Sequence, residues 1–183
     1  LERANKLKNF NFPFYTEDKN IKNYLQEIKK NSNFKVTTNN SVLSDVDVVI
    51  VSLSLDIKKN FKSFNDTNFL KAIRNIGRNI NEDTLVIIQS TVPIGYTRKI
   101  IYPILKKYFH KRKLNLSKLY LAHSYERVTP GKNYLNSIKN SHRAYAGINE
   151  KSEIKCKYFL SRFINHKKYP LTKMQNTDAS ELS

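Results

Sequence analysis

Short apolar runs alternate with amphipathic segments along this chain, and this alternation restricts its fold more than any other feature. The apolar runs are residues 46–55, 84–90, 118–124 and 142–148, of which the last is the weakest. The first is a nearly continuous series of β-branched residues, which is typical of a strand covered on both faces. We therefore predict a strand at each of the four positions.

Segments with helical spacing separate the apolar runs. Residues 67–80 and 97–109 each carry an apolar stripe, and Pro103 in the second should kink the helix or mark its first turn. Residues 20–30 and 150–163 are two further amphipathic segments. Strands that alternate with helices through short connections predict an α/β fold with a mainly parallel sheet. No internal repeat or Gly/Ser linker interrupts the chain, so we expect one domain.

The charge balance is strongly basic, with 33 Lys and Arg against 15 Asp and Glu, a net charge of +18. Such a balance can indicate nucleic-acid binding, so a basic α/β nucleic-acid-binding module is the alternative function. The basic residues are scattered, however, and residues 106–113 are the one stretch that mixes them with aromatics. We favour a solvated basic surface with no specific nucleic-acid partner.

Several classes of site are disfavoured by the composition. A single cysteine, Cys156, excludes an internal disulfide and is compatible with the reducing cytoplasm. Its spacing from Phe159, Leu160 and Phe163 favours a core residue over a nucleophile. The four histidines lack metal-ligand spacing, and no apolar run approaches the roughly 18 residues of a membrane span. We expect no metal and no membrane partner.

The two ends of the chain and its glycines carry further information. The chain begins without Met, and both ends fall within apparent helices, so we expect a fragment truncated at both ends. Neither G-x-G-x-x-G nor G-x-x-x-x-G-K-[ST] occurs, so the loop that cradles nucleotide phosphates is absent from these residues.

Two polar turns follow the second and third apolar runs, at residues 89–97 and 124–132. Ligands of parallel α/β sheets bind beyond the carboxyl ends of the strands, so these turns are candidate site segments. The first could bring backbone amides to an anion, or be an ordinary turn with Thr97 as a helix N-cap. In the second, Glu126 could act as a general base, or pair with Arg127 or with a helix. From spacing alone both alternatives stay open.

Four segments resemble, in order and spacing, the UDP-sugar/GDP-mannose dehydrogenase family. They are "FKVTTNNSVLSDVDVVIVSLSL" (34–55), "TLVIIQSTVPIGYTRKIIYPIL" (84–105), "LAHSYERVTPGK" (121–132) and "TKMQNTDASELS" (172–183). The family oxidises the C6 alcohol of a nucleotide sugar to a carboxylate in two NAD-dependent steps. The resemblance implies a Rossmann-like fold, a mainly parallel sheet with flanking helices, and NAD as the cofactor.

The chain departs from the family pattern in three places. Tyr96 stands between Gly95 and Thr97, Tyr125 replaces the usual Pro, and "LSL" at residues 53–55 replaces Val-Pro-Thr. The Glu-Arg-Val form of the second turn is similar to the branch that acts on N-acetylhexosamines. A UDP-N-acetylhexosamine is therefore the substrate that the resemblance implies.

The resemblance also assigns roles to individual residues. Thr91 corresponds to a threonine beside the nicotinamide and a catalytic water, and Glu126 to the general acid/base of the hydrolytic half-reaction. The implied cofactor-binding residues are Thr91, Ser90, Ser52 and Leu53, and the implied substrate-binding residues are Glu126, Arg127 and Val128. The family's catalytic lysine and cysteine would lie outside these residues, so Cys156 is not expected to be the nucleophile.

The family also implies an organisation for the whole protein. Residues 1–172 would be the distal part of the NAD-binding domain, and residues 173–183 the start of the helix that links it to the sugar-binding domain. The full-length enzyme would be a cytoplasmic homo-oligomer that makes precursors of polysaccharides. This fragment is expected to be inactive alone.

Overall fold

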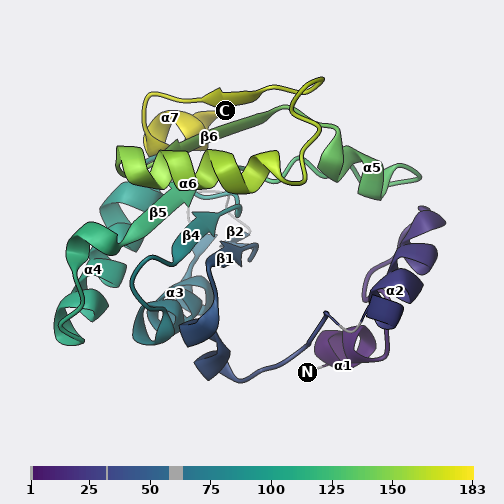
Figure 1. Ribbon diagram of the computed structural model, residues 1–183, viewed down its shortest axis with the longest axis horizontal. Helices are drawn as coiled ribbons and strands as arrows, with labels where there is room; N and C mark the ends of the chain where they lie inside the picture. Colours follow the sequence, from purple (N-terminus) through teal and green to yellow (C-terminus); the bar gives the residue numbers. More distant parts are fainter. Residues whose placement is uncertain (1, 32, 58–63) are drawn as a thin grey trace.

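The computed structural model describes residues 2–31, 33–57 and 64–183, and a five-stranded sheet forms its centre (Figure 1). The strand order is β1-β4-β5-β6-β7. Strands β1, β4 and β5 are parallel to one another, β6 is antiparallel to β5, and β7 is parallel to β6. A separate antiparallel pair joins β2 to β3. The strands are β1 (Val48–Val51), β2 (Asp56–Ile57), β3 (Phe64–Asn65), β4 (Leu85–Ile88), β5 (Tyr120–His123), β6 (Arg143–Gly147) and β7 (Leu171–Lys173).

Helices surround the sheet and connect its strands. The α-helices are α1 (Glu2–Lys8), α2 (Asn20–Asn31), α3 (Thr67–Asn79), α4 (Tyr102–Lys111), α5 (Tyr134–Lys139), α6 (Glu150–Ser161) and α7 (Thr177–Leu182). Two short 3₁₀ segments, Asn40–Asp45 and Leu116–Lys118, precede β1 and β5, and a π-helical segment, Thr97–Ile101, precedes α4. No helix in the described ranges is both long and apolar enough to cross a membrane.

The two faces of the sheet pack into two apolar clusters, because successive strand residues point to opposite faces. Val86 and Ile88 join the cluster that contains residues of α3 and α4. Leu85 and Ile87 join the cluster that contains Cys156 and Leu160 of α6. Figure 1 shows α6 on one side of the sheet and α3 and α4 on the other. Strand β4 is buried along its whole length, as expected of a strand covered on both faces.

Helices α1 and α2 lie apart from the sheet, and α2 is the one nearer to α5 (Figure 1). The buried carboxylate of Asp18 connects the two regions. It accepts hydrogen bonds from the backbone N–H of Asn20 at the start of α2, at 2.9 Å, and from that of Leu135 in α5, at 2.9 Å. These bonds lower the pKa of the Asp18 carboxyl, the Leu135 bond most strongly. Asp18 therefore ties the start of α2 to α5, the helix that follows the second polar turn.

The predicted α/β fold with a mainly parallel sheet is confirmed, with differences at the ends of elements. The first strand ends at Val51 rather than at residue 55. The fourth strand, β6, runs antiparallel, and β7 and the β2–β3 pair were not predicted. Pro103 lies in the first turn of α4, directly after the π-helical segment. Because proline has no N–H to donate to the residue four positions back, a local change of helical bonding at this point is expected.

Candidate active site

The two polar turns leave the sheet at the same edge. Strands β4 and β5 are parallel neighbours in which Ile88 is opposite His123. Thr91 follows Ile88 and Glu126 follows His123 by the same number of residues. The backbone N–H of Ser124 donates to the carbonyl of Ile88 at 3.0 Å, so the two strands are still in contact where the turns begin. The arrangement places both turns at the carboxyl edge, where parallel sheets bind ligands.

Ser90 uses its hydroxyl to join the ends of two strands. The hydroxyl accepts from the N–H of Leu53 at 2.8 Å and donates to the carbonyl of Val51 at 3.2 Å. Ser90 is buried, whereas Ser52, Leu53 and Thr91 are exposed. The cofactor-binding residues expected from the resemblance therefore form one strip along the ends of β1 and β4, with Ser90 as the internal support.

Glu126 forms an ion pair with Arg143, the first residue of β6. The Arg143 Nη2 is 2.5 Å from the Glu126 Oε1, and the Arg143 side chain is fully buried while that of Glu126 is 27% exposed. The same guanidinium donates to the carbonyls of Tyr125, at 2.5 Å, and Ile138, at 3.3 Å. The ion-pair partner is thus in a strand, and the expected alternatives of Arg127 or a helix are wrong.

The two residues after Glu126, Arg127 and Val128, differ in their exposure to solvent. Arg127 is exposed and donates to the main-chain oxygen of Ser183 at 2.8 Å, which places it against the end of α7. Val128 is half-buried. The expected roles of both in substrate binding remain predictions.

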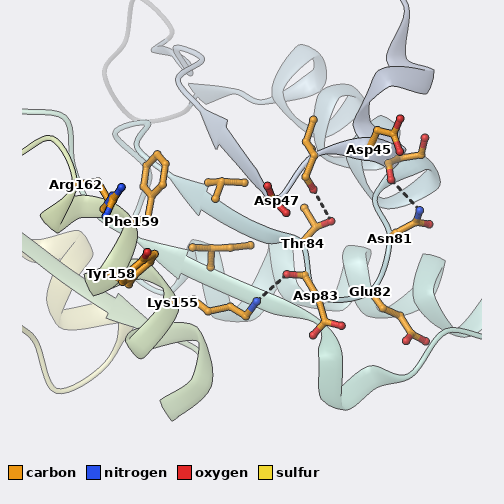
Figure 2. Close-up of a pocket in the computed structure, with 14 residues that line it drawn as sticks. Asp45, Asp47, Asn81, Glu82, Asp83, Thr84, Lys155, Tyr158, Phe159 and Arg162 are labelled. Atoms are coloured by element: carbon orange, nitrogen blue, oxygen red, sulfur yellow. Dashed lines mark hydrogen bonds between the residues drawn. The ribbon is translucent and has the colours of Figure 1, made fainter.

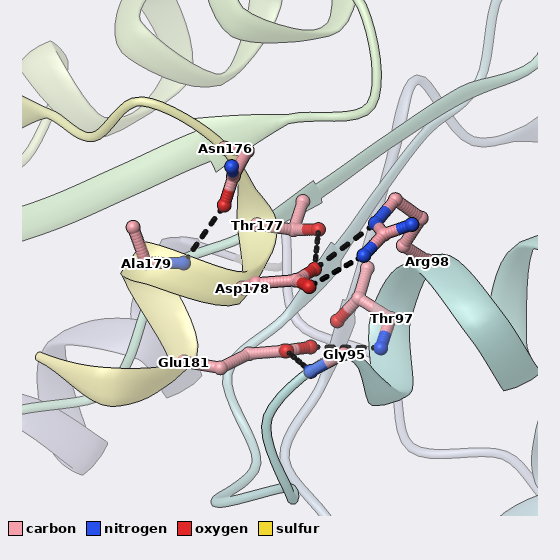
Figure 3. Close-up of polar contacts among 8 residues, drawn as sticks. All are labelled: Gly95, Thr97, Arg98, Asn176, Thr177, Asp178, Ala179 and Glu181. Atoms are coloured by element: carbon pink, nitrogen blue, oxygen red, sulfur yellow. Dashed lines mark hydrogen bonds and ion pairs between the residues drawn. The ribbon is translucent and has the colours of Figure 1, made fainter.

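Helix α7 packs against the first turn through two carboxylates (Figure 3). The buried Glu181 carboxylate accepts from the backbone N–H groups of Gly95, at 2.5 Å, and Thr97, at 2.7 Å. Arg98 makes two bonds to Asp178, at 3.1 and 2.6 Å. A carboxylate is favourable at the first amides of a helix because they are unpaired and carry partial positive charge. The alternative in which Thr97 is a helix N-cap is wrong: the helical segment begins at Thr97 with Tyr96 in the N-cap position, and in the described part of the chain the buried Thr97 hydroxyl has no hydrogen-bond partner.

His123 is a buried imidazole between the sheet and α7. Its Nδ1 is 2.9 Å from the Ser180 hydroxyl, and burial lowers its pKa to about 4. The ring is therefore neutral at pH 7. Among the described residues, its Nε2 and the neighbouring Ser124 hydroxyl are buried without a hydrogen-bond partner.

Cys156 lies in the core, as predicted from its spacing. The side chain is fully buried in α6, and burial raises the pKa of the thiol to about 12. A thiol with that pKa is protonated at neutral pH, and only the thiolate is a strong nucleophile. Cys156 therefore has a structural role in the second apolar cluster.

A cavity of about 950 Å³ lies at the opposite edge of the sheet (Figure 2). Its lining includes Asp47 and Thr84, which precede β1 and β4, and Lys155 and Tyr158 of α6. The cavity therefore opens at the amino ends of the strands, away from both polar turns. Over the described residues, no group of three or more His, Cys, Asp or Glu is placed to hold a metal ion.

The mostly parallel five-stranded sheet, with helices on both faces and two polar turns at its carboxyl edge, defines a Rossmann-like α/β protein. The model of the UDP-glucose/GDP-mannose dehydrogenase family, NAD binding domain, matches residues 2–162. The chain belongs to this family. The family's domain binds NAD, the cofactor that the resemblance implied.

Curated relatives and solved structures agree with this assignment. UDP-N-acetyl-D-mannosamine dehydrogenase of Methanococcus vannielii is 29% identical over 168 residues, which cover 92% of this chain and 36% of the relative. The Methanococcus aeolicus enzyme of the same name is 33% identical over 127 residues, 69% of this chain and 27% of the relative. A crystal structure of an NDP-N-acetyl-D-galactosaminuronic acid dehydrogenase from Methanosarcina mazei superposes with a TM-score of 0.87 at 22% identity, covering 98% of this chain and 37% of that one. The chain thus spans about a third of the length of these proteins.

Three residues at this edge were not singled out from the sequence: His123, Arg143 and Glu181. Arg143 could have been predicted to form an ion pair, because an arginine inside a buried apolar strand needs a partner for its charge. The roles of Glu181 and His123 could not have been predicted from the sequence, because their contacts depend on how α7 packs against the sheet.

Proposed function

We propose that this chain is part of an NAD-dependent dehydrogenase that oxidises the C6 hydroxyl of a UDP-N-acetylhexosamine to a carboxylate. The observation that carries the proposal is the position of Thr91 and Glu126 at matching places beyond two adjacent parallel strands. Two relatives carry the name UDP-N-acetyl-D-mannosamine dehydrogenase, which supports an N-acetylated substrate.

The described residues fit one end of an NAD molecule. Ser52, Leu53 and Thr91 form an exposed strip at the ends of β1 and β4, and the Ser90 hydroxyl fixes the spacing of those ends. NAD, when bound, supplies the hydride acceptor for the oxidation. The four glycines of the chain do not form a G-x-G-x-x-G loop, so these residues hold part of the cofactor site.

Glu126 is proposed as the general acid/base. One carboxylate oxygen is held by Arg143, and the side chain is still 27% exposed, so the group is both fixed in place and open to a substrate or water. A proton acceptor must be held within hydrogen-bond reach of the proton that it removes. Arg127 and Val128, which follow it, are proposed to contact the sugar nucleotide, and Thr91 to lie beside the nicotinamide.

We also propose a domain organisation, a location and an oligomeric state for the whole protein. Residues 1–172 are assigned to the NAD-binding domain and residues 173–183 to the start of a linking helix, which is supported by α7 at Thr177–Leu182. The full-length enzyme is proposed to be a cytoplasmic homo-oligomer in the synthesis of polysaccharide precursors. The net charge of +18 is assigned to a solvated surface without a specific nucleic-acid partner.

A chimaeric enzyme tests the proposed function. Residues 2–183 replace the aligned segment of the Methanococcus vannielii relative, and NADH formation is measured with UDP-N-acetyl-D-mannosamine and other UDP-N-acetylhexosamines. We expect turnover that Glu126→Gln lowers by roughly 10²–10⁴-fold, the usual effect of losing a general acid/base. Cys156→Ala should leave the rate nearly unchanged, and the chain alone should form no NADH. Full turnover by a folded Glu126→Gln chimaera contradicts the proposal.

A further inference from the structure

The hydroxyl of Tyr125 lies between the first turn and α7. It is 2.7 Å from the main-chain oxygen of Glu181 and 3.2 Å from that of Val92. A phenol carries one proton, which it donates chiefly to the nearer oxygen and shares with the other. Burial raises the pKa of the Tyr125 hydroxyl, so it remains a donor throughout the neutral range. One side chain therefore contacts two segments that are distant in sequence.

The ring and the backbone of Tyr125 are also held. The ring stands at 84° to the His123 imidazole, with the ring centroids 4.4 Å apart, and His123 itself is bound to Ser180 of α7. The Tyr125 carbonyl accepts from the buried Arg143 guanidinium at 2.5 Å. A side chain fixed at its hydroxyl, its ring and its carbonyl has little freedom to reorient.

The contacts of Tyr125 connect the two turns that carry Thr91 and Glu126. Val92 follows Thr91, and Tyr125 precedes Glu126. We propose that Tyr125 is a positioning residue whose hydroxyl sets the spacing of the Thr91 and Glu126 turns and couples both turns to α7. The inference depends on the proposed function only for what Thr91 and Glu126 do.

Local hydrogen exchange in the 183-residue chain tests the coupling, because it distinguishes a positioning role from general stabilisation. In Tyr125→Phe, the Gly95 and Thr97 amides, which Glu181 holds, should exchange roughly 5–10-fold faster, the effect of losing one net hydrogen bond. Val86 and Ile87 of β4 should keep their wild-type rates. Tyr145→Phe, in a buried tyrosine of the second apolar cluster, should leave Gly95 and Thr97 unchanged. Equal acceleration at all four amides, or none at Gly95 and Thr97, overturns the proposal.

A second measurement applies if Tyr125→Phe does not fold. In wild-type protein with ¹³Cζ-labelled tyrosine, the Tyr125 resonance should titrate above the ordinary tyrosine pKa of about 10. Titration of Tyr125 at the ordinary tyrosine pKa of about 10 shows a free hydroxyl and overturns the proposal. Neither measurement needs a ligand, so the coupling can hold or fail independently of the proposed enzyme activity.

Discussion

Arg143 and Glu126 form an ion pair of 2.5 Å between a fully buried guanidinium in the sheet and a carboxylate in the turn beyond it. The guanidinium also binds the carbonyls of Tyr125, in the same loop as Glu126, and of Ile138, in α5 after that loop. A buried arginine without its partners is strongly destabilising, and here both terminal nitrogens are bonded, while the Nε has no partner among the described residues. Arg143 thus anchors the loop that presents the proposed general acid/base.

Arg143→Ala should destabilise the chain by about 3 kcal/mol, in the range found when one member of a buried ion pair is removed. Arg143→Lys should recover only part of this loss, because a single ammonium cannot reproduce the forked contacts to Glu126 and Tyr125. Urea unfolding followed by circular dichroism measures both. Arg127→Ala is the matched control, since Arg127 is exposed and should cost less than about 1 kcal/mol. Equal losses for the two arginines contradict the anchoring role.

Glu181→Gln should destabilise the chain by about 1–3 kcal/mol, because the carboxylate that accepts from Gly95 and Thr97 is replaced by an amide with one acceptor oxygen. The loss should be larger than for Glu27→Gln, an exposed glutamate of α2 that serves as the control. Thermal unfolding of the two variants gives the comparison. An unchanged midpoint for Glu181→Gln indicates that α7 does not hold the turn in solution.

The sequence predicts the centre of the fold better than its edges, for physical reasons. Continuous apolar runs locate β1, β4 and β5, because strands buried on both faces need such runs. The same logic places Thr91 and Glu126 at strand ends. The antiparallel direction of β6 and the short β7 depend on tertiary pairing, which no local pattern encodes. The contact of Glu181 with Thr97 spans 84 residues, so it could not be inferred before the fold was known.

The thiol of Cys156 should be unreactive in the native protein. Its side chain is fully buried and burial raises its pKa to about 12, so neither access nor thiolate is available near neutral pH. Labelling with a disulfide reagent such as DTNB should be slow in buffer and fast in urea, with a rate that follows the unfolded fraction. Fast labelling of the folded chain contradicts the core assignment. Cys156→Ser should cost about 1–3 kcal/mol, since it buries a hydroxyl among apolar side chains.

Acid should destabilise the chain through His123. Its pKa is lowered to about 4 in the folded state by burial, against about 6.5 when unfolded. Between these values the unfolded state binds the extra proton, so the free energy of unfolding falls as the pH falls from about 6.5 towards 4. The loss is at most about 3 kcal/mol over that window. Carboxyls whose pKa is lowered by their partners, such as Asp18 and Asp178, lose their contribution to the free energy of unfolding at lower pH. The change in stability in the upper part of the pH range from about 6.5 to 4 is therefore assigned to His123.

Urea unfolding at a series of pH values from about 7 to 4.5 measures this dependence, over the range in which the unfolded-state histidine titrates. His123→Gln keeps a hydrogen-bonding side chain but cannot titrate, so its stability should change less across the series than that of the wild type. His110→Gln makes the same substitution at an exposed histidine of α4 and is the control for the change of side chain itself. If His123→Gln retains the full slope between pH 6.5 and 4.5, another group is responsible and His123 is not held neutral against Ser180.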